Sequence, residues 1–202
     1  IMGTGSSTYG RNAAGESWLA GGRGHLISDE GSGYWLGIQA MRAAVRAFDG
    51  RGCDTQLLPM LLARLEIGSI DDLMHRLYVR NMARSEIAAL GPLVIEAAEA
   101  GDLKAQAILD DGAHEVAECV YAVARRLGMV NGAVEVCGVG GVLDSSTAMR
   151  WRFAGAVMQL LPEAQVKSAA LPPVLGSAIL ALQVAGVVVD DGVRKVMRAT
   201  QA

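Results

Sequence analysis

Residues 133–142 read Ala133-Val134-Glu135-Val136-Cys137-Gly138-Val139-Gly140-Gly141-Val142. The first half has the pattern of a β-strand, and it runs straight into a glycine-rich turn. A helix is expected next, over about 145–161, followed by a short strand over 164–168. Strand, glycine-rich turn and helix in this order are how α/β proteins build ligand sites at the carboxyl ends of strands. The stretch therefore predicts an α/β fold.

Two more glycine-rich turns lie near the amino terminus. The first, Gly3-Thr4-Gly5-Ser6-Ser7, follows Ile1-Met2, which has the pattern of the end of a buried strand. The second, Gly21-Gly22-Arg23-Gly24, comes after an expected hairpin with strands over 8–11 and 16–20. Glycine lets backbone N–H groups approach a phosphate because it adds no Cβ. Together with the turn at 138–142, these loops predict a nucleotide or phosphate site.

The segment between residues 32 and 128 has helical patterns only. The first helix is expected over about 32–48, with an apolar face formed by Trp35, Ile38, Met41, Val45 and Phe48. Further helices are expected over 55–66, 71–79, 85–100 and 101–127, with Asp71 and Ser85 as N-caps. The long last one is expected to bury Leu103, Ala107, Ile108, Ala113, Val116, Val120 and Val123. This predicts an all-helical insert, over about 38–128, within the α/β domain.

Composition excludes several kinds of partner. The chain has 202 residues, of which 51% are apolar, so it can bury a substantial core. A net charge of −3 and an aromatic content of 4% argue against nucleic acid. The longest apolar run, 174–189, is interrupted and falls short of the roughly 20 residues that span a bilayer, so no membrane partner is expected.

The cysteines and histidines form no metal-binding motif. Cys53, Cys119 and Cys137 are far apart, which indicates reduced, mostly buried thiols of a cytoplasmic protein. The histidines have no zinc-ligand spacing, so no metal site is expected.

Three common site motifs are missing. There is no GxxxxGK[ST], which excludes a P-loop NTPase. A dinucleotide fingerprint fails at both glycine-rich turns, because Thr8 and Leu143 stand where the third glycine would be. No GxSxG occurs either, which argues against an α/β-hydrolase.

The glycine-rich blocks resemble the signature of N-acetylglucosamine kinases and the related BadF/BadG/BcrA/BcrD-type ATPases. The resemblance is carried by Gly3-Thr4-Gly5-Ser6, Ala20-Gly21-Gly22-x-Gly24-His25-Leu26 and Asp29-Glu30-Gly31-Ser32-Gly33-Tyr34-Trp35-Leu36-Gly37. It continues through 85–90, 101–102, 138–143 and 171–176, and so covers nearly the whole chain. These proteins belong to the sugar kinase/Hsp70/actin superfamily. The resemblance thus implies that residues 1–202 form a ribonuclease H-like (actin-like ATPase) C-terminal domain, with the N-terminal domain absent from this chain.

Site residues follow from the resemblance by position. It implies that Gly3, Thr4 and Gly5 contact the ATP phosphates, and that Gly140 and Gly141 let the adenosine lie against the backbone. It assigns the sugar to Ser6, Ser7, Gly22, Arg23, Gly24 and Asp29. Arg23 stands where the family commonly has Trp, which suits an anionic or more polar substrate. From the residues alone, Asp29 could instead cap the helix that begins near Ser32, and Glu30 could serve its dipole.

The implied reaction is phosphoryl transfer from ATP, assisted by Mg²⁺, to N-acetylglucosamine or a close amino sugar. The resemblance also allows a homodimer. Superfamily kinases carry a DxGxT loop and a catalytic aspartate in their N-terminal domain, and no DxGxT occurs here. The catalytic residues are therefore expected upstream of Ile1, and the chain alone is expected not to turn over.

Two other functions stay open at this point. One is an ATPase of the same family that activates a partner reductase or dehydratase. Such activators usually hold an iron–sulfur cluster through cysteines, and the scattered cysteines here offer no pair for it. The other is a sugar- or nucleotide-sensing module without catalysis.

Overall fold

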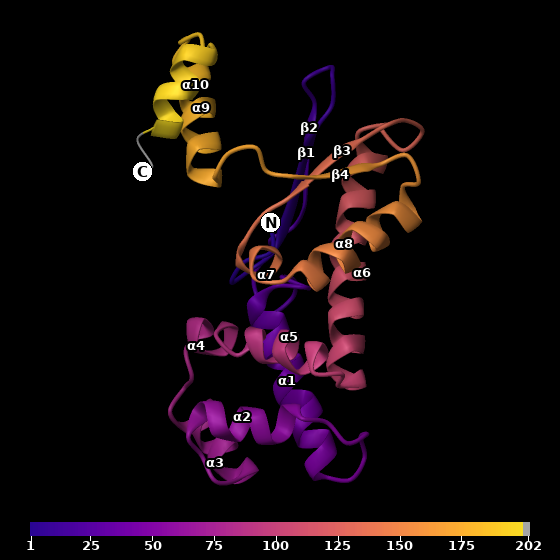
Figure 1. Cartoon of the computed structure of the whole chain (residues 1–202), viewed down its shortest axis with the longest axis vertical. Coiled ribbons are helices and arrows are strands. Elements are labelled where there is room, and N and C mark those ends of the chain that lie inside the picture. The colour runs from indigo at the N-terminus through magenta and orange to yellow at the C-terminus, as the bar shows by residue number, and fades with distance from the viewer. Residues whose placement is uncertain (200–202) are drawn as a thin grey trace. The chain divides into compact units, whose positions relative to one another are not determined.

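The structure, a computed structural model, describes residues 1–199 (Figure 1). The chain divides into two compact units, residues 1–166 and 167–202, and the site described below lies in the first. The elements are β1 (Ser7–Arg11), β2 (Ser17–Gly21), α1 (Gly33–Phe48), α2 (Leu57–Leu65), α3 (Ile70–Met74), the π-helical turn η1 (His75–Val79), α4 (Arg84–Ala88), α5 (Gly91–Glu99), α6 (Leu103–Arg126), β3 (Glu135–Gly138), α7 (Gly141–Asp144), α8 (Thr147–Leu160), β4 (Gln165–Ser168), α9 (Pro173–Val184) and α10 (Asp191–Ala199).

The predicted mixture of helices and strands is confirmed, and so is the amino-terminal hairpin. β1 pairs antiparallel with β2, and the turn is closed by a hydrogen bond from the Asn12 N–H to the Glu16 carbonyl (2.9 Å). β3 pairs with β4. The N–H of Gln165, the first residue of β4, donates to the Val134 carbonyl just before β3 (2.8 Å). Within residues 1–199 the strands thus form two separate two-stranded sheets.

Every element between β2 and β3 is helical, as the sequence predicts. Figure 1 shows α6 as the longest rod of this part, running beside both the hairpin and α8. Arg126, in the last turn of α6, lies over the Trp18 ring of β2 (4.4 Å to the ring centre). One hydrophobic core joins Met2 to α1, α5, α6 and α8, and a second joins the other side of α1 to α2, α3 and α4. That these helices are an insert stays a prediction.

The buried surface of α1 is wider than the predicted face and excludes its last residue. Phe48 is 64% exposed, whereas Leu36, Gly37, Ala40 and Ala44 are buried. Small residues decide this face, because they let a neighbouring backbone approach closely. A Cβ atom at Gly37 would collide with the Ile87 carbonyl of α4. The apolar period of three and four therefore predicted the helix and most of its packed face. Met41 is buried, and Trp35, Ile38 and Val45 are half-buried and pack against the two cores. Only Phe48 of the predicted face is exposed.

Several predicted details of the other helices are also wrong. The N-cap of α3 is Ser69, not Asp71. The N-cap position of α4 is Ala83, not Ser85, and the Ala83 N–H donates to the Glu86 carboxylate (2.8 Å). The predicted helix over 85–100 is two helices, because Gly91 and Pro92 start a new one. In α6, Leu103 and Ala107 face solvent while the other predicted stripe residues are buried. The first turn of α6 still reaches the core through Ala105, which is fully buried.

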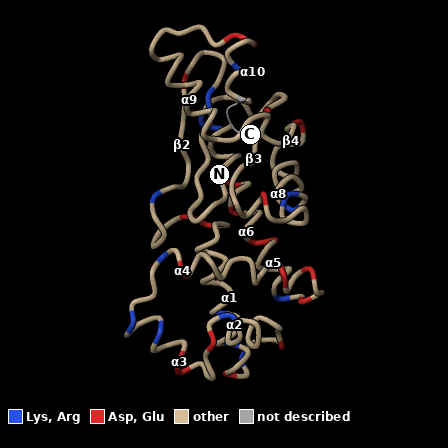
Figure 2. Tube along the Cα trace, turned by 60° about the vertical axis from the view of Figure 1, so that its left-hand side comes forward, with Lys and Arg blue, Asp and Glu red and all other residues tan. Residues whose placement is uncertain are grey.

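Charged residues of both signs are interspersed along the trace, as Figure 2 shows. The prediction of mostly buried thiols is wrong, because Cys53 and Cys137 are exposed and only Cys119 is half-buried. Among residues 1–199, no helix is long and apolar enough to cross a membrane.

Asp102 joins two helices at their amino ends. Its Oδ1 accepts the Ala105 N–H (2.9 Å) and so caps α6, while its Oδ2 accepts the Thr55 hydroxyl and the Gln56 N–H (both 2.6 Å) just before α2. Burial alone would raise the pKa of Asp102, but the hydrogen bonds from Thr55, Ala105 and Gln56 outweigh burial and hold that pKa below its ordinary value. The carboxylate therefore stabilises the fold in its ionised form.

We expect Asp102→Asn to lower the free energy of unfolding at pH 7 by roughly 2 kcal/mol, because an amide nitrogen cannot accept at the Oδ2 position. The native carboxylate stabilises above its unfolded pKa, and this contribution is lost as the pH falls through its lower folded pKa. Urea unfolding at pH 7 and pH 2.5 should therefore show a difference between the variant and the parent that shrinks in acid. Asp111→Asn, on an exposed part of α6, is the control and should change little. Equal losses for both variants would contradict the assignment.

Candidate functional site

The first glycine-rich loop is docked on the amino end of α1. The Gly3 carbonyl accepts the Gly33 N–H (2.8 Å) and the Thr4 carbonyl accepts the Tyr34 N–H (3.3 Å). Within the loop, the Gly3 N–H donates to the Gly5 carbonyl (2.9 Å) and Met2 forms a bridge with Ser6. Two loop carbonyls thus accept hydrogen bonds from the first N–H groups of α1, while the Thr4 side chain is exposed.

The same loop is tied to the glycine-rich turn that follows β3. The Met2 N–H donates to the Val139 carbonyl (2.8 Å), and the Met2 carbonyl accepts the Val142 N–H (3.0 Å). Gly140 has a φ of +116° and packs directly on Met2, where a Cβ would lie 2.5 Å from the carbonyl oxygen. Gly140 is thus required by the Met2 backbone, whatever else lies beside it. Gly141 differs, because a Cβ there would meet nothing within 4 Å.

A cavity of about 590 Å³ lies between these loops and the start of α5. Its lining brings together Gly3, Thr4 and Gly141, three of the residues predicted for ATP. The opposite wall consists of residues from α1, α4, α5 and the segments between them, namely Gly33, Leu36, Ser85, Ala88, Ala89, Gly91, Pro92 and Ile95. This wall was not assigned from the sequence, although the family resemblance runs through residues 85–90. The cavity is mostly apolar with polar backbone at one end, as pockets for small molecules commonly are.

The residues predicted for the sugar gather on the other side of the first loop. Ser6 donates its hydroxyl to the Glu30 carbonyl (2.6 Å), and its N–H donates to Asp29 Oδ1 (3.2 Å). Ser7 is paired with Gly21 across the hairpin and lies against Gly22. Arg23 is exposed and Gly24 half-buried in the loop that follows β2. The structure thus brings Ser6, Asp29, Ser7 and Gly22 together.

Asp29 does not cap α1. It is only 3% exposed, has a φ of +66°, and precedes Ser32, whose hydroxyl accepts the Trp35 N–H (3.1 Å) as the N-cap. The alternative in which Asp29 is the helix cap is therefore wrong. Instead, its carboxylate fastens the first loop through Ser6.

Arg84 is the residue that the sequence did not point to. Its Nη2 donates to Asp29 Oδ2 (2.7 Å), and both side chains pack against Gly5. The two residues are 55 positions apart, so no local pattern could have paired them. An almost buried carboxylate needs such a partner, because an unpaired buried charge is strongly destabilising. Arg84 therefore completes the support of the loop.

Acidic side chains of α6 lie near the loop between β2 and α1. Burial, with the nearby carboxylates of Glu30 and Glu118, raises the pKa of Glu115. Burial and the carboxylates of Glu30 and Glu115 also raise the pKa of the Cys119 thiol, which disfavours its thiolate form. His25 contacts the Tyr34 ring edge-on (4.8 Å between ring centres). Among residues 1–199, no three His, Cys, Asp or Glu side chains lie together as metal ligands would.

These features define a class: a mixed α/β protein in which glycine-rich loops at strand ends enclose a cavity for a small ligand. The chain belongs to the BadF/BadG/BcrA/BcrD ATPase family, which it matches over residues 1–181.

Two relatives with assigned activities are similar to it. One is an N-acetylmuramic acid/N-acetylglucosamine kinase of Clostridium acetobutylicum, 38% identical over 181 residues, or 90% of this chain and 59% of the relative. The other is an N-acetyl-D-glucosamine kinase of Dictyostelium discoideum, 30% identical over 184 residues, or 90% of this chain and 58% of the relative. The chain thus spans less than two thirds of the length of both proteins.

Two solved structures have a similar fold. A putative N-acetylglucosamine kinase from Chromobacterium violaceum superimposes with a TM-score of 0.67 at 27% identity, covering 89% of this chain and 57% of the other. A putative N-acetylglucosamine kinase from Porphyromonas gingivalis has a TM-score of 0.53 at 15% identity, covering 87% and 56%, and supports the fold alone.

The two neighbouring glycines of the turn give a matched pair of variants. We expect Gly140→Ala to lower the free energy of unfolding by roughly 3 kcal/mol, because it adds backbone strain and a clash with Met2. We expect Gly141→Ala to change it by less than about 0.5 kcal/mol, because its Cβ would point into open space. Chemical denaturation measures both. Equal effects at the two positions would show that Met2 does not hold the turn.

Replacing Arg84 should destabilise the loop at residues 3–7, because it leaves the buried Asp29 carboxylate without its charged partner. We expect Arg84→Met to lower the free energy of unfolding by about 1–2 kcal/mol, a value reduced because the arginine side chain is 42% exposed. Adding Asp29→Asn to it should cost less than the sum of the single changes, because the neutral amide leaves no unpaired charge. Arg42→Met, on an exposed position of α1, is the control. Strictly additive effects in this double-mutant cycle would contradict the pairing.

Proposed function

We propose that the protein to which this chain belongs transfers a phosphoryl group from ATP to a hydroxyl of N-acetylglucosamine or a close amino sugar. One observation carries the proposal. The loop at residues 3–7 lines the cavity with Gly3 and Thr4, opposite Gly141, and the same loop is held by Asp29 and Arg84 through Ser6. A site for a nucleotide and a site for a polar acceptor would thus share one loop. The names of the two relatives support a sugar kinase rather than another ATPase.

In the proposed complex, the adenosine occupies the cavity and the phosphates face the Gly3-Thr4-Gly5 loop. The apolar wall, with Ala88, Pro92 and Ile95, suits a purine and ribose, and Gly141 leaves room for them. The exposed Thr4 hydroxyl is available to donate to a phosphate oxygen. We propose that Gly140 contributes by holding the turn on Met2 rather than by touching the nucleotide.

The acceptor sugar is proposed to lie against Ser6, Ser7, Gly22, Arg23, Gly24 and Asp29. A carboxylate has about four lone-pair sites. Asp29 uses one for the Ser6 N–H and one for Arg84. Because its side chain is only 5% exposed, a sugar hydroxyl would reach the carboxylate by displacing the half-exposed Arg84. We assign Asp29 this binding role. Arg23, exposed in the same loop, would favour substrates with an acidic substituent.

Further proposals rest on the family. We infer a ribonuclease H-like, actin-like fold for the chain, a cytoplasmic location and a homodimer. Phosphoryl transfer of this kind commonly uses Mg²⁺. The positioning of ATP and acceptor by the shared loop is the contribution that this chain makes.

The test uses the full-length gene product, ATP and a panel of amino sugars. We expect ADP formation that depends on N-acetylglucosamine or a close relative, with a matching yield of sugar phosphate. A rate of ATP hydrolysis that no amino sugar changes would refute the kinase proposal and favour an ATPase that activates a partner. An absence of any turnover, with sugar binding intact, would favour a sensing module.

A pair of substitutions tests the cavity. Ala89 lines it and is exposed, so that Ala89→Phe should fill the cavity and weaken binding of ADP at least about tenfold without lowering the melting temperature. Ala63→Phe makes the same change on an exposed face of α2 and should leave binding unchanged. Calorimetric titration measures both.

A further inference from the structure

The ion pair between Asp29 and Arg84 lies between the two sites of the proposed function. A Cβ built on Gly5 would lie 2.5 Å from Arg84 Nη2 and 2.8 Å from Asp29 Oδ2, so both charged groups lie directly against the proposed phosphate loop. Arg84 is the first residue of α4, and the next residue, Ser85, lines the 590 Å³ cavity. The guanidinium group therefore lies beside the proposed sugar site and beside the proposed nucleotide site.

The two partners of this ion pair differ in their freedom to move. The Asp29 side chain is only 5% exposed and also accepts the Ser6 N–H (3.2 Å), whereas the Arg84 side chain is 42% exposed. The backbone of α4 is fixed, because the Ile87 carbonyl packs directly against Gly37 of α1. A ligand that takes the Asp29 carboxylate would thus displace the Arg84 side chain and leave the helix in place.

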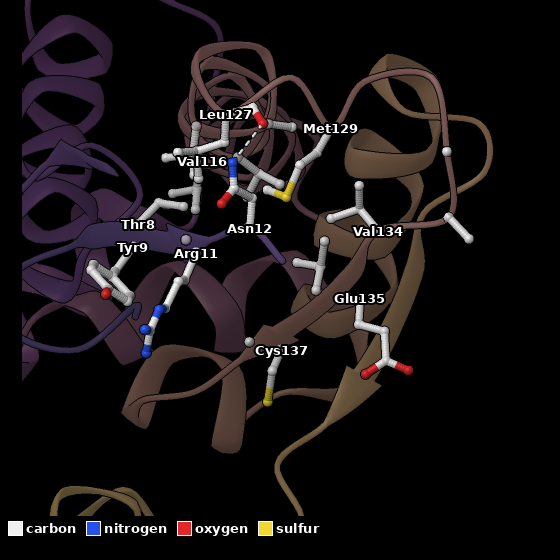
Figure 3. Close-up of a pocket in the computed structure, with 18 of the residues that line it drawn as sticks. Thr8, Tyr9, Arg11, Asn12, Val116, Leu127, Met129, Val134, Glu135 and Cys137 are labelled. Carbon is white, nitrogen blue, oxygen red and sulfur yellow. Dashed lines mark hydrogen bonds between the residues drawn. The ribbon is translucent and has the colours of Figure 1, made fainter. Parts of the chain in front are cut away.

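The 590 Å³ cavity offers the phosphates of a nucleotide no cation of its own. Within the described part of the chain, none of its lining residues has a charged side chain. Arg11 lines a separate cavity of about 750 Å³ between β1 and β3 (Figure 3), and it donates to the Gly15 carbonyl (3.3 Å). Phosphoryl transfer depends on cations that neutralise the phosphate charges. A guanidinium group freed beside Gly5 would supply one, because its planar fork binds phosphate through two hydrogen bonds.

We propose that Arg84 changes partner when the sugar binds. The sugar hydroxyls replace it at Asp29, and its guanidinium group turns to the phosphates of ATP at the Gly3-Thr4-Gly5 loop. This inference rests on the proposed function, since it needs a sugar at Asp29 and a nucleotide at that loop. Asp29 stays hydrogen-bonded throughout, with the Ser6 N–H and the sugar hydroxyls as donors, so that no unpaired buried charge remains. Arg84 is thus a positioning residue for ATP that only the bound sugar releases.

The change of partner links the two binding equilibria. Without the nucleotide, the sugar must break an ion pair, and without the sugar, the Arg84 guanidinium group is held by a carboxylate. Each ligand removes the cost that the other one meets, so each should bind more tightly when the other is present. Linkage requires the two increases in affinity to be equal. ATP bound without the sugar would lack this cation, which disfavours transfer of its phosphoryl group to water.

The experiment measures the affinity of the full-length gene product for N-acetylglucosamine, alone and with saturating AMP-PNP, an ATP analogue that is not cleaved. We expect AMP-PNP to tighten sugar binding at least about tenfold. In Arg84→Met, the sugar alone should bind at least about threefold more tightly than in the parent, because no ion pair opposes it. The effect of AMP-PNP should fall below about twofold in this variant. Arg84→Lys keeps the charge and should keep most of the effect.

Arg42→Met, on an exposed position of α1, is the matched control and should behave as the parent does. Melting temperatures establish that each variant is folded during the titration. Weaker sugar binding by Arg84→Met would overturn the inference, because Arg84 would then support Asp29 in the bound state. So would an effect of AMP-PNP that survives in Arg84→Met, or one that Arg42→Met also removes. These results leave the proposed function standing, whereas a parent that phosphorylates no amino sugar refutes the proposed function and this inference with it.

Discussion

The main-chain hydrogen bonds of Met2 are the constraint on which the first unit depends. They join the loop at residues 3–7 to the turn after β3, two segments that lie more than a hundred positions apart in the sequence. The Met2 side chain is at the same time fully buried in the main core. Local backbone geometry and long-range packing therefore meet at one residue, and the 590 Å³ cavity opens beside it.

Close approach between backbones is the second theme of this unit. α1 presents small residues to α4, and its first N–H groups are spent on the carbonyls of the glycine-rich loop. The helix is thus held at its end by polar contacts and along its length by packing without large side chains. Asp102 performs a similar task for α2 and α6, with a carboxylate in place of a backbone. The loops are positioned by helices that cannot easily slide.

The sequence predicts those features that depend on residues close together in the chain, and misses those that depend on residues far apart. The hairpin, the glycine-rich turn and the existence of the helices depend on neighbouring residues, and they are confirmed. The contact of α1 with α4 was missed because Gly37, which makes it, gives no hydrophobic signal. The Asp29–Arg84 pair was missed because the two residues are brought together only by packing. Asp29 itself was singled out from its motif, but its partner was not.

The tie between Met2 and the turn is made by main-chain atoms. It therefore does not depend on which side chains stand at Val139 or Thr4, but it forbids any side chain at Gly140. In such a site, Gly140 must stay a glycine, whereas the side chains at Val139 and Thr4 can change without breaking the hydrogen bonds of Met2. An exposed residue such as Arg23 can therefore be replaced without disturbing the backbone framework beside it.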